Sequence, residues 1–75
     1  MENMSIRITG AMAHQYEGVK NVYVYVDGIL RSRYITRNVS KIVNILKEDA
    51  EDMNVEVVEI IDEDQIQEMY EEYYK

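Results

Sequence analysis

Carboxylates are the most abundant charged groups in this sequence, and ten of them lie in or next to two predicted helices in its second half. They are Glu48, Asp49, Glu51, Asp52, Asp62, Glu63, Asp64, Glu68, Glu71 and Glu72. Carboxylates three or four residues apart on a helix lie about 5 to 6 Å from one another, a row that resembles the phosphates of a nucleic-acid strand with their roughly 3.4 Å rise. These residues are therefore predicted to bind a basic surface on a partner. A solvated face that only keeps the protein soluble is the alternative interpretation.

The same carboxylates have the chemistry to hold Ca²⁺ or Mg²⁺, because both ions prefer oxygen ligands. However, the run from Asp62 to Asp64 lacks the glycine and the alternating ligands of a calcium-binding loop. We therefore predict no metal site and no cofactor.

A second group of residues suited to binding lies in the middle of the chain and comprises Tyr23, Tyr25, Arg31 and Arg33. Aromatic rings interleaved with arginines on an open sheet face can stack on bases and contact phosphates of single-stranded nucleic acid. Two other interpretations are cross-strand pairing of tyrosine with arginine and a protein interface, including a homodimer through the sheet. The net charge of −7 argues against nucleic acid, because phosphate contacts dominate such affinity.

The residues available for catalysis are few. The chain has no cysteine and a single histidine, His14, which lies with Tyr16 in a predicted loop over residues 13–18. A lone histidine without a partner at a recognisable spacing is a weak catalytic signal. There is also no glycine-rich phosphate loop, so the sequence predicts a protein that is not an enzyme.

Length and composition predict one small domain over residues 1–75, with 47% hydrophobic residues. No apolar run approaches the roughly 18 residues of a membrane-spanning helix, and no signal-peptide pattern is present, so we expect a cytoplasmic protein. Charge is divided unevenly. Residues 1–47 hold seven basic and three acidic residues, a balance of +4, and residues 48–75 hold one basic and twelve acidic residues, a balance of −11. Such asymmetry indicates electrostatic partners.

The elements that must position these groups are organised around a hairpin over residues 20–36, with its turn at Asp27-Gly28. A two-residue turn would pair Val24 with Arg31 and place guanidinium groups on the valine face. A three-residue loop would instead pair Val24 with Leu30 and Tyr23 with Arg31. We favour the second register, because it leaves one face apolar and suited to burial. The other face, with Tyr23, Tyr25, Arg31 and Arg33, would then point outward.

Periodicity predicts the remaining elements. Alternation indicates a strand over residues 4–12, and a continuous apolar run indicates another over residues 55–61. Helical spacing predicts helices over residues 38–53 and 65–74, capped by Thr36 or Asn38 and by Asp62 or Asp64. The order is β-β-β-α-β-α, which predicts a two-layer α+β sandwich. Its four-stranded, mostly antiparallel sheet would carry both helices on one face, with the last strand parallel to the third and next to the first.

Together these features predict a non-enzymatic, acidic protein-binding module that covers a basic nucleic-acid-binding surface of a larger protein. In length and acidity the chain is similar to small inhibitors of phages and mobile elements, such as anti-CRISPR or anti-restriction proteins. The alternative is a small domain that binds RNA or single-stranded nucleic acid through the tyrosine and arginine residues of the hairpin.

Overall fold

The computed structural model describes residues 2–10 and 18–75, and His14 and Tyr16 lie outside these ranges. The described residues form strands β1 (Asn3–Gly10), β2 (Lys20–Val26), β3 (Ile29–Thr36) and β4 (Asn54–Glu59), and helices α1 (Val39–Asp49) and α2 (Glu63–Tyr73). The predicted α+β class and the β-β-β-α-β-α order are confirmed. Among these residues no helix is long and apolar enough to span a membrane.

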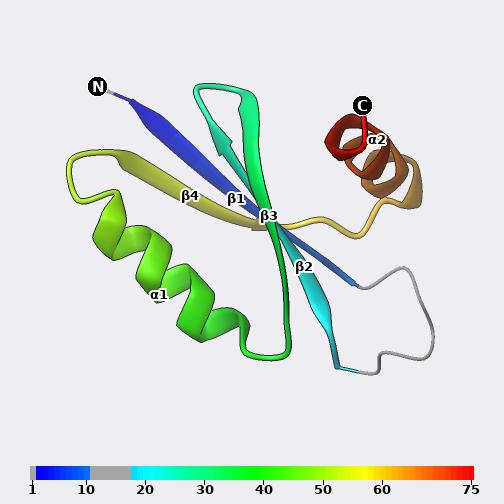
Figure 1. Ribbon diagram of the computed structural model, residues 1–75, viewed down its shortest axis with the longest axis horizontal. Coiled ribbons are helices and arrows are strands. Elements are labelled where there is room, and N and C mark those ends of the chain that lie inside the picture. Colours follow the sequence, from blue (N-terminus) through cyan, green and yellow to red (C-terminus); the bar gives the residue numbers. More distant parts are fainter. Residues whose placement is uncertain (1, 11–17) are drawn as a thin grey trace.

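The four strands form one mixed sheet in the order β3-β2-β1-β4 (Figure 1). β2 pairs antiparallel with both β1 and β3, whereas β4 pairs parallel with β1. β4 therefore runs in the same direction as β3, which confirms the predicted crossover through α1. The connection through α1 thus passes over β2 and β1 and adds β4 at the other edge of the sheet.

The observed register of the hairpin differs from both predicted registers. Its turn has two residues, with Asp27 at φ 50° and Gly28 at φ 81°, and Val26 pairs with Ile29. A bulge then inserts Arg31, so that Val24 pairs with Ser32. Both predicted pairings of Val24 are therefore wrong. The bulge removes the guanidinium from the valine face, and the favoured Asp-Gly turn is retained.

The two helices cover opposite faces of the sheet, so the predicted two-layer sandwich with both helices on one face is wrong (Figure 1). On one side α1 packs on a core that contains Met4, Ile6, Val22, Val24, Leu46 and Ala50. On the other side α2 packs on a core that contains Tyr23, Tyr25, Ile60 and Met69. Because successive strand residues point to opposite faces, the alternating valines and tyrosines of β2 are both buried. The molecule has three layers, and neither face of its central strands is open.

Candidate functional site

The ten acidic residues predicted to bind a partner are all exposed, but the structure separates them into two surfaces. The first, the α1-end cluster, consists of Glu48, Asp49, Glu51 and Asp52 at the end of α1 and in the turn that follows. The second, the α2 cluster, consists of Asp62, Glu63, Asp64, Glu68, Glu71 and Glu72. Figure 1 shows α1 and α2 on opposite faces of the sheet, so the two clusters belong to different sides of the molecule. The two clusters are therefore treated as two separate surfaces.

Helix α2 has a well-defined start and a fixed orientation. The side chain of Asp62 accepts hydrogen bonds from the backbone N–H groups of Asp64 at 2.9 Å and Gln65 at 3.1 Å. Acidic residues in this first turn also interact favourably with the positive end of the helix dipole. Met69, which is 3% exposed, and the half-buried Ile66 face the sheet. The opposite side of the helix is therefore fixed toward solvent.

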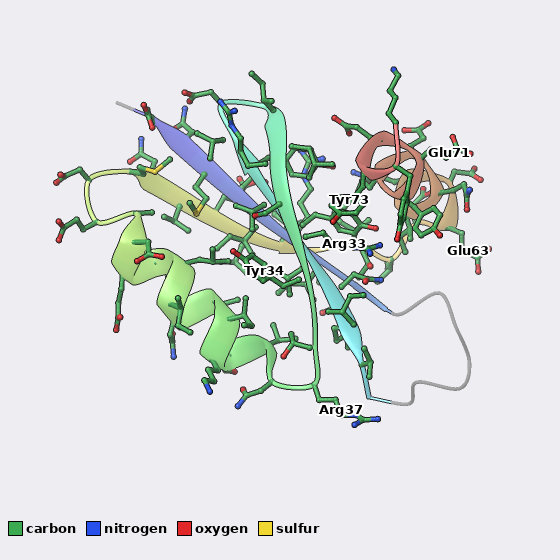
Figure 2. The ribbon with its side chains drawn as sticks, viewed as in Figure 1. Arg33, Tyr34, Arg37, Glu63, Glu71 and Tyr73 are labelled. Carbon is green, nitrogen blue, oxygen red and sulfur yellow. The ribbon has the colours of Figure 1, made fainter. Side chains whose placement is uncertain are left out.

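Three carboxylates form a stripe on that outer side of α2, at Asp64, Glu68 and Glu71. At 100° per residue these three positions lie within a sector of about 60°, opposite the side of the helix that Ile66 and Met69 share. Figure 2 shows Glu71 and Glu63 on the part of α2 that faces away from the sheet. The ion pair found among the described residues joins Lys20 to Glu59 at 4.0 Å, and it involves none of the stripe. The negative charge of the stripe is therefore available to a partner.

Glu72, the last residue of the α2 cluster, makes a contact within the chain. Its carboxylate accepts a hydrogen bond of 3.4 Å from the Tyr25 hydroxyl, on the side of the helix that turns back toward the sheet. The Arg7 guanidinium lies 4.3 Å from the centre of the same tyrosine ring. We therefore assign Glu72 to the attachment of α2 rather than to the outward stripe.

The tyrosine and arginine residues of the hairpin also serve to hold α2. The Arg33 guanidinium stacks 4.3 Å from the Tyr73 ring centre and donates a 2.9 Å hydrogen bond to the Tyr74 hydroxyl. Figure 2 shows Arg33 and Tyr73 side by side between β3 and α2. Tyr23 and Tyr25 are 0% and 3% exposed. The prediction that this face is open is therefore wrong, because the apolar side of α2 covers it and leaves no room for a stacked base.

The buried Tyr23 hydroxyl has no hydrogen-bond partner among the described residues. Burial raises the pKa of Tyr23 above its usual value, and the Arg33 guanidinium opposes that rise. Burial also raises the pKa of Tyr25, to which the negative charge of Glu72 adds. The unfolded chain therefore releases both protons at lower pH than the folded protein does. The contribution of these two tyrosines to stability should be constant below the usual tyrosine pKa of about 10 and should fall as the pH rises further.

We expect Tyr23→Phe to leave the free energy of unfolding at pH 7 unchanged, or to raise it by about 1 kcal/mol, because it removes an unpaired buried hydroxyl. The same variant should lose less stability than the original protein between pH 9 and pH 11, a range of about one unit on either side of the usual tyrosine pKa. Urea unfolding across this range measures both effects. Tyr34→Phe, on an exposed ring, is the control and should keep the original alkaline loss. A large loss of stability at pH 7 in Tyr23→Phe would contradict the assignment.

A pocket of about 490 Å³ lies where the start of α2 meets the ends of three strands. Its lining includes Ile60, Ile61 and Ile66, with the Lys20–Glu59 ion pair among its polar residues. The sequence did not predict this pocket, because its walls come from three separate stretches of the chain. Its lining has no serine, threonine or cysteine, and within residues 2–10 and 18–75 no three acidic, histidine or cysteine side chains are grouped so that they could hold a metal ion.

Comparison with known proteins gives no further assignment. No family model matches the sequence, and searches of curated proteins and of solved structures found no match.

Proposed function

We propose that this chain is a non-enzymatic protein-binding module that uses the outer face of α2 to cover a basic, nucleic-acid-binding surface of a larger protein. The observation that carries the proposal is the α2 stripe of Asp64, Glu68 and Glu71. Its carboxylates are exposed and have no ion-pair partner among the described residues. A phosphate-binding groove on a partner offers lysine and arginine side chains at comparable spacing.

The attachment of α2 supports this role energetically. Binding by a flexible acidic segment loses affinity because the segment must be ordered, whereas a helix already packed on a sheet has little order left to gain. Met69 packs α2 on the sheet, and Tyr25 and Arg33 contact its last turn through Glu72 and Tyr73. The stripe is therefore presented in one geometry before the partner arrives. Electrostatic attraction over several ångströms would also speed the encounter and make it sensitive to salt.

The α1-end cluster is the weaker candidate. Glu48 and Asp49 lie in the last turn of α1, next to the negative end of its dipole, and Glu51 lies in the turn beyond it. Carboxylates divided between a helix end and a turn do not form a continuous row. This difference allows a matched experiment, since the two clusters can be reversed in charge separately.

We expect reversal of the stripe in the triple variant Asp64→Lys, Glu68→Lys and Glu71→Lys to weaken partner binding by at least about a hundredfold, because like charges facing each other at an interface cost several kcal/mol. The matched control is the triple variant Glu48→Lys, Asp49→Lys and Glu51→Lys, which changes net charge by the same amount on the other side. It should bind almost as the original protein does. All six side chains are exposed, so the substitutions disturb no buried contact, and Asp64→Lys removes only the favourable interaction of its carboxylate with the α2 dipole.

The measurement is affinity capture from a nuclease-treated lysate of the source host at low and high salt, with mass spectrometry of the bound proteins. The proposal predicts a nucleic-acid-binding protein that the control variant retains, that the stripe variant loses, and that added nucleic acid displaces. Equal loss in both variants would indicate a general charge effect and contradict a specific α2 surface. Unchanged capture by the stripe variant would disprove the proposal.

A further inference from the structure

The outer strands of the sheet, β3 and β4, are open edges among the described residues. An open edge presents backbone N–H and C=O groups that can pair with another chain. Both edges also expose apolar side chains, because Tyr34 and Ile35 of β3 are 39% and 62% exposed and Val57 of β4 is 42% exposed. Each edge thus combines backbone pairing capacity with apolar surface that pairing would bury.

The charges of the two edges are complementary. β3 carries Arg31 and Arg33 and no acidic residue, whereas β4 carries Glu56 and Glu59 and no basic residue. A two-fold dimer through β3 would bring arginines together, and one through β4 would bring glutamates together. Like charges on adjacent strands destabilise the pairing, and opposite charges stabilise it. The charges therefore favour contact between unlike edges of two copies.

The side chains of the two edges also match face by face. Arg33 lies opposite Tyr23 on the α2 side of the sheet, and Tyr34 lies opposite Val22 on the α1 side. On β4, Val58 belongs to the α2-side core, and Val57 lies beside Ile6 on the α1 side. Figure 2 shows Tyr34 and Arg33 on opposite sides of β3. Because β3 and β4 run in the same direction, a second copy in the same orientation continues the sheet with its helices on matching sides.

We propose that β3 of one molecule pairs in parallel with β4 of a second copy. The register that fits places Arg33 beside Glu56, Tyr34 beside Val57, and Ile35 beside Val58. All six residues of β4 then face β3, from Arg31 beside Asn54 to Thr36 beside Glu59. The arginine gains a carboxylate, and the exposed apolar side chains gain apolar neighbours. The contact leaves one edge free on each copy, so assembly is head to tail.

This inference is independent of the proposed function. The α2 stripe points away from the sheet and stays exposed when the edges pair. Reversal of the stripe should therefore leave self-association unchanged, and blocking an edge should leave binding to the basic partner unchanged. Either proposal can fail without the other.

Three exposed apolar positions provide the test. Ile35→Lys places a charge at the β3 edge, Val57→Lys places one at the β4 edge, and Ile45→Lys places one on α1, away from both edges. Molecular mass is measured by sedimentation velocity and light scattering from micromolar to millimolar protein. Physiological salt, with a screening length of about 8 Å, limits the repulsion between molecules of net charge −7. The original protein and Ile45→Lys should rise above the monomer mass of 8.9 kDa as concentration increases.

Each edge variant alone should associate at least about tenfold more weakly, because pairing would bury an uncompensated ammonium group. An equimolar mixture of Ile35→Lys and Val57→Lys retains one intact edge of each kind. It should form a dimer and nothing larger. A constant monomer mass for the original protein would overturn the proposal, as would a mixture that stays monomeric. Association of Val57→Lys alone at the original strength would indicate β3–β3 pairing, and that of Ile35→Lys alone would indicate β4–β4 pairing; either result overturns it.

Discussion

Ile6→Ala should lower the free energy of unfolding by about 2 to 5 kcal/mol, the range for deleting a large buried aliphatic side chain. Ile6 is 0% exposed and lies on β1, between β2 and β4, in the core that α1 covers. A domain of 75 residues has little other core that could shift to fill the cavity left by the smaller side chain. Small domains have a total stability of only about 5 to 15 kcal/mol, so this single change should unfold a measurable fraction of molecules on mild heating.

Thermal and urea unfolding, followed by circular dichroism, measure the effect of Ile6→Ala. The control is Ile61→Ala, the same chemical change at a side chain that is 83% exposed. It should alter stability by less than about 0.5 kcal/mol, as surface substitutions usually do. Equal effects of the two variants would show that β1 is not at the centre of the core.

Much of this fold follows from local sequence patterns. The Asp27-Gly28 turn, the helical spacing before residue 50 and the parallel direction of two strands joined through a helix are each determined by a few neighbouring residues or by a general rule. These features correctly predicted the order of the elements and the place of β4 beside β1. The bulge at Arg31 was not predicted. The bulge allows a two-residue turn while keeping arginine off the buried valine face. Whether the chain forms a bulge or a longer loop depends on packing beyond the hairpin.

The position of the second helix was also missed, although the sequence contains a signal for it. β2 reads Val-Tyr-Val-Tyr-Val over residues 22–26, with apolar or aromatic side chains on both faces. A strand of this kind is typical of sheets that are covered on both sides. Interpreting the tyrosine rings as an exposed stacking surface overlooked that such large apolar rings are equally suited to burial under a helix. The same error placed Tyr23 and Tyr25 in a nucleic-acid site.

The acidic residues were correctly predicted to be exposed, but their division into two surfaces could not be predicted from spacing. Each helix fixes its own outward face through its own apolar stripe. The relation between the two outward faces depends on which side of the sheet each helix covers. Once the helices lie on opposite sides, Glu48 and Glu68 belong to different surfaces, and only the α2 stripe forms a continuous row.

Met69→Ala should loosen α2 and lower the free energy of unfolding by about 2 to 5 kcal/mol. Met69 is 3% exposed and is the one buried side chain that α2 contributes to the core it shares with Tyr23, Tyr25 and Ile60. The loss of stability should appear first in α2 itself. Because each helix packs on its own face of the sheet, hydrogen exchange should lose protection in α2 before it does so in α1. Met69→Leu, which nearly conserves volume, is the control and should cost less than about 1.5 kcal/mol.

The Met69 variants also separate the two functions considered for this chain. If the α2 stripe binds the partner, a loosened helix must be ordered again on binding, so Met69→Ala should weaken binding although Met69 touches no partner. Loosening α2 also uncovers Tyr23 and Tyr25, the rings that could stack on bases. Binding of a labelled single-stranded oligonucleotide should nevertheless stay undetectable, since the acidic helix remains tethered beside the uncovered face and repels phosphate. A gain of oligonucleotide affinity in Met69→Ala, absent in Met69→Leu, would instead make α2 a cover over a nucleic-acid site and reverse the assignment of the two surfaces.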